Sequence, residues 1–311
     1  MLARITSQFQ RVAVRSFATA TRSSTPLPRP RLLTIVNPSA DELEVLGERY
    51  LERAVRAVHQ DGLVVVENVV PHDVIDSLNK KMVGDALVLQ ARGKDGPFNY
   101  NQGNLQQDAP SVREQFHSSI FITNAAMPPI SGVESQRQPV HADADFAYPA
   151  HPFALVVNVP LVTMTPENGS TEVWLGTHTG DLSQQEGAHG ERASGRIKQD
   201  LLRQRAETDP PSQPVIPKGS IVIRDLRLWH AGMPNKTDQV RIMLAMIHFA
   251  SWYRNPMRLE FSDDIKPLLE DLKREGKLGV QAPIDWVERE DVLGRYLNRG
   301  FGNSYDFGQS H

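Results

Sequence analysis

The sequence predicts a mainly β protein with flanking helices, arranged as a jelly-roll barrel. Three observations support this fold class: a helical stretch opens the folded part, short β-rich runs dominate the middle, and turn formers separate those runs. Five runs are rich in β-branched and aromatic residues, at 116–124, 153–162, 170–175, 220–228 and 240–250. Strands this short, packed behind helices, are typical of a barrel with helices on one face.

The first elements follow from capping and periodicity. Ser39 is a suitable N-cap, Asp41 and Glu42 favour the first turn of a helix, and apolar residues then recur at helical spacing as far as Asp61. Residues 63–66 are four consecutive apolar residues, which predicts a buried strand. A short second helix is expected over residues 71–82.

Turns and one insertion divide the rest of the chain. Turn-forming residues at 166–169, 217–219 and 234–236 separate the β-rich runs. Residues 197–206 have the pattern of a helix inside a long insertion at about 183–214. No internal repeat is present, so residues 39–311 are expected to form a single domain.

The first 38 residues differ in composition from the remainder. Six arginines and many Ser and Thr residues precede the first acidic residue, Asp41, which is typical of a mitochondrial transit peptide; the alternative is a disordered basic tail. The run Arg15-Ser16-Phe17 before Ala18 is similar to a matrix-processing site. Three prolines at 26, 28 and 30 then predict a stiff linker. A mitochondrial location is therefore expected, with a cytoplasmic one as the alternative.

Composition excludes several classes of protein. The 311 residues contain 34 Lys and Arg against 37 Asp and Glu, so binding of nucleic acid by bulk positive charge is excluded. Cysteine is absent, which excludes thiolate zinc sites, iron–sulfur clusters and a cysteine nucleophile. No apolar run approaches the ~20 residues that a membrane span needs. A small-molecule substrate is the expected partner; the oligomeric state stays open, a homodimer included.

Without cysteine, a transition-metal site must combine histidines with carboxylates. Two His and one carboxylate on one face suit non-haem iron. The pattern His-x-Asp occurs at His59 and at His141, but His59 ends a helix, where its side chain and that of Asp61 diverge. His141 and Asp143 lie among β-rich segments, where residues i and i+2 point the same way. Asp145 would share their face and is a rival ligand.

The second histidine expected at this site is His230, at the end of an alternating strand. If a hairpin is centred between Asn235 and Lys236, His230 faces Arg241 across it. A buried Arg241 needs an anionic partner, which is either a carboxylate on a metal-chelating acid or an internal Asp or Glu. Spacing alone leaves these two open. His178 is interpreted as a structural hydrogen-bonding group at the cavity rim.

These segments together resemble the phytanoyl-CoA dioxygenase superfamily, in particular its fungal Fe(II)/2-oxoglutarate-dependent oxygenases. The first-ligand segment of that family is similar to residues 138–143, and its Asn-Gly turn is similar to residues 167–178, where Leu175 and Thr177 depart from the family pattern. The strand that delivers the distal histidine matches residues 218–230, and the family's first strand matches residues 61–68.

The resemblance implies a double-stranded β-helix, or cupin-like, barrel. It also implies that His141, Asp143 and His230 bind Fe(II), and that Arg241 anchors 2-oxoglutarate. Gln138 and Thr171 match positions of further polar contacts to this cosubstrate. With O₂, the family oxidises a substrate carbon and releases succinate and CO₂, and an intact Asp143 favours hydroxylation or desaturation over halogenation.

Two other functions stay open on the residues alone: a metal-dependent hydrolase or isomerase on a cupin-like barrel, and a metal-free binding module. The substrate is also open, between an acyl-CoA and a secondary metabolite. An acyl-CoA would need a basic surface, for which the candidates are Arg192, Arg196, Lys198, Arg203 and Arg205. A lid is expected from three irregular segments, at 93–110, 125–135 and 187–214.

Overall fold

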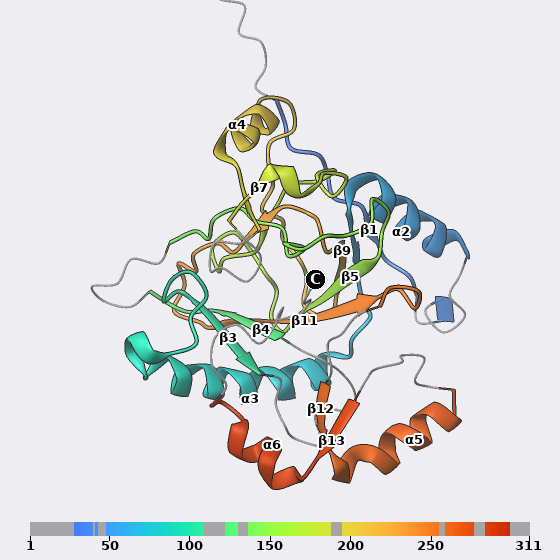
Figure 1. The fold of residues 1–311 in the computed structure, drawn as a ribbon, viewed down its shortest axis with the longest axis vertical. Helices are drawn as coiled ribbons and strands as arrows, with labels where there is room; N and C mark the ends of the chain where they lie inside the picture. The colour runs from blue at the N-terminus through green and yellow to red at the C-terminus, as the bar shows by residue number, and fades with distance from the viewer. Residues whose placement is uncertain are drawn as a thin grey trace, which may run out of the picture.

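The computed structural model is built around a seven-stranded mixed sheet flanked by helices (Figure 1). It describes residues 28–39, 41–42, 48–108, 122–129, 136–187, 195–254, 259–276 and 284–298. The expected mainly β architecture with flanking helices is confirmed. Among the described residues, no helix combines the length and the apolar character that crossing a membrane requires.

The large sheet has the strand order β1-β2-β9-β5-β11-β4-β3. Its first two strands pair in parallel and all other neighbours are antiparallel. In this order, the bounds are Ile35–Val36, Leu63–Val66, Ile221–Asp225, Ala154–Pro160, Arg241–Phe249, Ile122–Ala126 and Asn104–Asp108. Strand β1 joins the sheet before residue 39, so the folded domain begins N-terminal of the boundary that the sequence suggested.

A second, much shorter sheet pairs β6, Glu172–Val173, with β10, His230–Ala231. An isolated antiparallel bridge between His141 and His230 extends it by one segment. The two sheets face each other through one apolar cluster, which joins Leu63 and Val222 of the large sheet to Val173 and Leu228. This packing of two sheets face to face is the jelly-roll arrangement.

Helix α3, His72–Gln90, covers the outer face of the large sheet below β3, β4 and β11 (Figure 1). Its apolar side, with Ile75 and Met82, packs on Ile242 and Leu244 of β11. The helix was expected to end at Met82 and instead continues for two more turns. The polar Asp85 on its buried side accounts for the difference, because it interrupts the apolar pattern.

The Asp85 carboxylate is paired by tertiary contacts that no local sequence pattern reveals. Lys81 Nζ lies 2.7 Å from Asp85 Oδ1, and the hydroxyl of Tyr296 also donates to Asp85. Tyr296 follows a C-terminal unit that the sequence did not predict, made of β12, Leu259–Ser262, α5, Lys266–Arg274, β13, Ile284–Val287, and α6, Arg289–Arg295. Strands β12 and β13 pair in parallel.

Helix α2, Glu48–Asp61, packs on β1 and β2 through Ala57, Val36 and Val64. The expected start near Ser39 is supported by a reciprocal cap: Ser39 Oγ accepts from the Glu42 amide at 3.3 Å, and the Glu42 carboxylate accepts from the Ser39 amide at 2.9 Å. Residues 43–47 lie outside the described residues.

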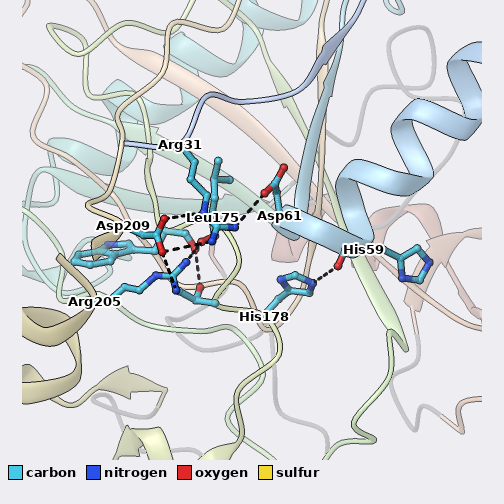
Figure 2. Close-up of polar contacts among 9 residues, drawn as sticks. Arg31, His59, Asp61, Leu175, His178, Arg205 and Asp209 are labelled. Carbon is cyan, nitrogen blue, oxygen red and sulfur yellow. Dashed lines mark hydrogen bonds and ion pairs between the residues drawn. The ribbon is translucent and has the colours of Figure 1, made fainter. Parts of the chain in front are cut away.

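Helix α4, Gln199–Thr208, confirms the helix expected in the insertion. It is tied to the N-terminal segment by Arg31, whose Nε donates to Asp209 Oδ1 at 2.8 Å and whose Nη1 lies 3.5 Å from Asp61 Oδ1 (Figure 2). Arg205 also reaches Asp209 at 3.3 Å and donates to the Leu175 carbonyl at 2.7 Å. Arg31 therefore links the N-terminal segment to the ends of two helices, α4 through Asp209 and α2 through Asp61.

The remaining elements are short, and some of them lie in the segments expected to form a lid. Three 3₁₀ turns lie at Gly93–Asp95, Leu182–Gln184 and Asp263–Ile265, and β7, Gln185–Glu186, pairs with β8, Arg196–Ile197. The segment 93–110 contains β3, the segment 125–135 begins inside β4, and the segment 187–214 contains α4. Much of the expected lid is therefore regular structure, and residues 109–110, 130–135 and 188–194 lie outside the described residues.

Candidate metal centre

Two histidines that are far apart in the sequence are placed together by backbone pairing. The His141 amide donates to the His230 carbonyl at 3.0 Å, and the His230 amide donates back to the His141 carbonyl at 2.9 Å. Residues paired in this way project their side chains from one face. The two imidazole rings accordingly lie with their centroids 4.4 Å apart.

Asp143 completes a compact group with these histidines. Its Oδ1 lies 3.9 Å from His141 Nε2 and 3.6 Å from His230 Nε2, and one ligand atom from each of the three residues lies within 4.8 Å of the others. The i and i+2 geometry expected for His141 and Asp143 is present. Asp145 is not part of the group, and neither is the first His-x-Asp pattern, whose Asp61 contacts Arg31.

The hydrogen bonds of the histidines define which nitrogen is available to a metal. Nδ1 of His141 lies 2.9 Å from the Pro139 carbonyl, and Nδ1 of His230 lies 3.0 Å from the Leu228 carbonyl. Because a carbonyl only accepts, each Nδ1 carries the proton and each Nε2 keeps its lone pair facing Asp143. Burial lowers the pKa of both rings, and with the nearby Arg224 it brings that of His230 to about 3.

Asp143 is ionised in the same environment. Burial alone would raise its pKa, but the guanidinium of Arg224, with the two histidines, outweighs burial and lowers the pKa to about 2. Nη2 of Arg224 donates directly to Asp143 Oδ2. The site therefore offers two neutral imidazole nitrogens and one carboxylate oxygen, a donor set that fits a first-row divalent metal such as iron.

The expected pairing of His230 with Arg241 is wrong. His230 pairs with Val173 in the small sheet, whereas Arg241 pairs with Ala126 in the large sheet. The connection between them is not a tight hairpin, because Asn235 donates to the carbonyls of Ala126 and Gln239, at 3.0 Å and 2.6 Å. This side chain holds the loop open while the chain crosses from one sheet to the other.

Arg241 is nevertheless buried, as expected, with 3% of its surface exposed. Nη2 donates to the Gly169 carbonyl at 2.8 Å, while Nε and Nη1 have no hydrogen-bond partner among the described residues. No acidic side chain of the described residues pairs with it, which speaks against the internal Asp or Glu that spacing left open. Burial lowers its pKa to about 10, so the side chain stays charged at neutral pH.

Gly169 is what lets its carbonyl reach Arg241. Its φ is +81°, and a Cβ there would lie 2.5 Å from the Met233 carbonyl oxygen. A side chain at this position would push apart the turn before β6 and the loop after His230. The Asn-Gly turn recognised in the sequence therefore has a packing role beside the arginine.

The two further residues expected at the cosubstrate site differ in what surrounds them. Gln138 is buried, and its Oε1 accepts from the Gly232 amide at 2.8 Å, just beyond His230. Thr171 is half-buried, and its hydroxyl makes no hydrogen bond among the described residues. Both lie in segments that adjoin the site, but their contact with a cosubstrate stays a prediction.

Sequence reasoning missed three residues near the metal group. Arg224 and Asn158 are buried beside Asp143, with Arg224 Nε 3.4 Å from Asn158 Oδ1. Tyr100 has a positive φ of 67°, and its ring centroid lies 5.5 Å from that of His141. A signal existed for Arg224 alone, because it shares the even-numbered alternation of the run that ends at His230.

The comparison with known families agrees with this centre. Residues 100–243 match the family model described as phytanoyl-CoA dioxygenase (PhyH), a segment that contains the three metal-group residues and Arg241. This segment of the chain is therefore similar to the phytanoyl-CoA dioxygenase family.

Three solved structures that are similar to this chain have TM-scores below 0.5. AviO1 from Streptomyces viridochromogenes Tue57 is 17% identical, with 65% of this chain and 96% of that one covered and a TM-score of 0.47. The epimerase SnoN, in complex with Fe3+, alpha ketoglutarate and nogalamycin RO, is 18% identical over 66% of this chain and 85% of that one, also at 0.47. HygX from Streptomyces hygroscopicus, with nickel and 2-oxoglutarate bound, is 10% identical over 66% and 89%, at 0.45.

Proposed function

We propose that the protein is a non-haem iron oxygenase that uses 2-oxoglutarate and O₂ to oxidise a small organic substrate. The observation that carries this proposal is the pairing of a His141–Asp143–His230 group with a buried Arg241 that has no acidic partner among the described residues. The His-Asp-His group fits iron, and the buried arginine fits the distal carboxylate of a metal-chelating dicarboxylate.

Each of these residues has a defined task in the reaction. His141 and His230 would hold iron through Nε2, because their Nδ1 atoms are committed to backbone carbonyls. Asp143 would hold it through an ionised oxygen, and Arg241 would orient the cosubstrate through the two nitrogens that have no partner among the described residues. Iron with 2-oxoglutarate supplies the oxidation of a substrate C–H bond by O₂, with release of succinate and CO₂. The burial of His141 and His230, at 8% and 7% exposure, would limit access of water to the reacting atoms.

The reaction outcome that we propose is hydroxylation or desaturation, because Asp143 occupies a ligand position that related halogenases leave to chloride. For the substrate, two of the five basic residues considered for an acyl-CoA have partners within the protein. Arg205 binds Asp209 and Leu175, and Lys198 donates to the Ser183 carbonyl at 2.7 Å. These contacts leave fewer cations for the phosphates of an acyl-CoA, so a secondary metabolite is the substrate class that we propose.

Anaerobic addition of iron and 2-oxoglutarate tests the proposal. An oxygenase should develop a visible absorption band that requires both the metal and the cosubstrate, and should release succinate when O₂ and substrate are supplied. A hydrolase or isomerase on the same barrel would bind the metal without the band, and a metal-free binding module would show neither. A succinate-release screen across acyl-CoAs and small molecules then identifies the substrate class.

For the cellular location, we propose import into mitochondria with cleavage near Ala18. The support is the acid-free, Arg- and Ser-rich composition of the first residues. Cleavage there would leave Arg31 and its ion pairs in the mature protein. A C-terminally tagged full-length protein should co-localise with mitochondria, and a cytosolic protein that retains Met1 would contradict the proposal.

A further inference from the structure

The two oxygens of Asp143 have different surroundings. Oδ1 faces Nε2 of both histidines, at 3.9 Å and 3.6 Å. Oδ2 is engaged by Nη2 of Arg224, a side chain that is only 7% exposed. One oxygen is therefore directed to the metal group, and the other is held by a guanidinium from strand β9.

Arg224 is itself fixed in place. It sits in the interior of the large sheet, paired through its backbone with Leu63 on one side and Val156 on the other. Its Nε lies 3.4 Å from Oδ1 of Asn158, a residue 4% exposed on the neighbouring strand β5. Two strands of a rigid sheet thus define where the guanidinium lies, and through it where Oδ2 lies.

The next arginine of the same run shows that this arrangement is not a general property of the segment. Arg227 also lies in the interior, but its guanidinium binds both oxygens of Asp225, at 2.8 Å each, and does not touch the metal group. Two buried arginines three residues apart therefore hold two different carboxylates, and only Arg224 holds a metal-group residue.

From this geometry we propose that Arg224 is a positioning residue for the metal centre. By holding Oδ2, it makes Asp143 a one-oxygen ligand and prevents the carboxylate from turning away or from binding through both oxygens. This inference rests on the proposed metal-binding function of His141, Asp143 and His230. Groups that orient metal ligands in this way typically contribute about 10–100-fold to metal affinity.

Charge and geometry act in opposite directions here, which allows a sharp test. A positive charge beside the site disfavours a cation, so loss of charge alone would tighten metal binding. A planar guanidinium that holds Asp143 through Nη2 and Asn158 through Nε fixes the carboxylate and favours the metal. Arg224→Lys keeps the charge but replaces the guanidinium by a single ammonium. Any loss of metal affinity in this variant therefore comes from the lost geometry of the guanidinium and not from a change of charge.

The experiment is a titration of Co²⁺ alone into the purified apo chain, followed by calorimetry and by the visible spectrum of the bound ion. We expect Arg224→Lys to bind Co²⁺ roughly 10–100-fold more weakly, with an altered spectrum. The matched control is Arg203→Lys, at an exposed arginine of α4, which should behave as wild type. Affinity within about threefold of wild type, with an unchanged spectrum, would overturn the inference.

A second variant keeps the test decisive if Arg224→Lys does not fold, as judged by thermal melting of the apo protein. Asn158→Ala leaves Arg224 intact but removes the acceptor of its Nε, and should weaken Co²⁺ binding in the same direction by a smaller factor; unchanged binding would then overturn the inference. Failure of the proposed function looks different. In that case wild type does not bind Co²⁺, or Asp143→Ala binds it as tightly as wild type.

Discussion

Two arginines in this molecule are equally buried, at 3% exposure each, and have opposite surroundings. Around Arg227 every group is satisfied from within: Nε and Nη2 each donate to Asp225 at 2.8 Å, and Nη1 donates to the Ala150 carbonyl at 3.0 Å. Around Arg241 one carbonyl, that of Gly169, is the only acceptor among the described residues.

The difference separates a group that completes the fold from one that needs a ligand. A buried charge without a partner costs free energy, whereas a buried pair with good geometry offsets most of that cost. The Arg227 region needs nothing from outside. Arg241 has no anionic partner among the described residues, and under the proposed function the cosubstrate would supply one, so removal of residues from the two regions should have different consequences.

The largest effect is expected at the metal group. Asp143→Ala removes the charged ligand, so metal affinity should fall by more than the roughly 10–100-fold that orienting groups contribute, and iron-dependent succinate release should become undetectable. Circular dichroism should show that the fold survives. The control is Asp145→Ala. If that variant loses activity while Asp143→Ala keeps it, the assigned carboxylate is wrong. His141→Ala and His230→Ala should match Asp143→Ala.

Loss of Arg241 should affect cosubstrate binding most. Truncation of one partner of a buried charge pair costs about 2–5 kcal/mol, so the affinity of Arg241→Ala for 2-oxoglutarate should fall by roughly 30-fold to several thousand-fold. Arg241→Lys should recover only part of this. Iron affinity should change little, and the melting temperature without cosubstrate should fall less than that of Arg227→Met, because the only described acceptor that loses its donor is the Gly169 carbonyl and no carboxylate is stranded. A 2-oxoglutarate titration of the iron-loaded protein measures the effect; affinity within about threefold of wild type would reject the role.

Asp143 and Arg241 also show how much of the site could be predicted from the sequence. Asp143 was found by local geometry, because residues i and i+2 of an extended segment share a face whatever the sheet around them. Arg241 was found for a reason that proved wrong. A hairpin was assumed after His230, while in the structure Asn235 holds a wider loop that joins two sheets. Its burial was still predictable, since it is the one cation in an apolar strand.

Features set by long-range contacts were out of reach. The extension of α3 to Gln90 depends on Asp85 being satisfied by Lys81 and Tyr296, and the second is 211 residues away. Arg224 lies in the same run as His230, yet its partner, Asp143, is 81 residues earlier in the chain. Neither pairing leaves a periodic trace in the sequence, so only the folded chain reveals them.

A substitution at Arg227 should lower the free energy of unfolding and leave ligand binding unchanged. Arg227→Met strands the buried Asp225 carboxylate, and a broken buried pair costs about 3–5 kcal/mol. Chemical denaturation of the apo protein measures this loss. In the protein that remains folded, the affinity for 2-oxoglutarate should equal that of wild type. A large fall in that affinity with unchanged stability would erase the distinction between the two arginines.

Like Arg227, His178 should contribute to the stability of the fold, and its contribution should depend on pH. Its Nε2 lies 3.2 Å from the His59 carbonyl, and burial lowers the pKa of the ring below its usual 6.5. Above pH 6.5 the ring is neutral in both states, so the stability is fully present; below it the unfolded chain takes up a proton first and stability is lost as the pH falls. His178→Gln should make this decline shallower below pH 6.5, by at most ~1.4 kcal/mol per pH unit. An unchanged slope would show that the ring is not held neutral.

The smallest effect is expected at Arg31, whose side chain is 42% exposed while its partner Asp209 is 26% exposed. Exposed ion pairs are screened by solvent and contribute about 0–1 kcal/mol, so Arg31→Ala should lower the melting temperature only slightly although it removes contacts to both Asp209 and Asp61 (Figure 2). Arg205 should keep α4 in place through the Leu175 carbonyl. Differential scanning calorimetry of Arg31→Ala and Arg205→Ala separates the two contributions. A loss from Arg31→Ala as large as that from Arg227→Met would mean that the N-terminal segment is as integral to the fold as the buried Asp225 pair.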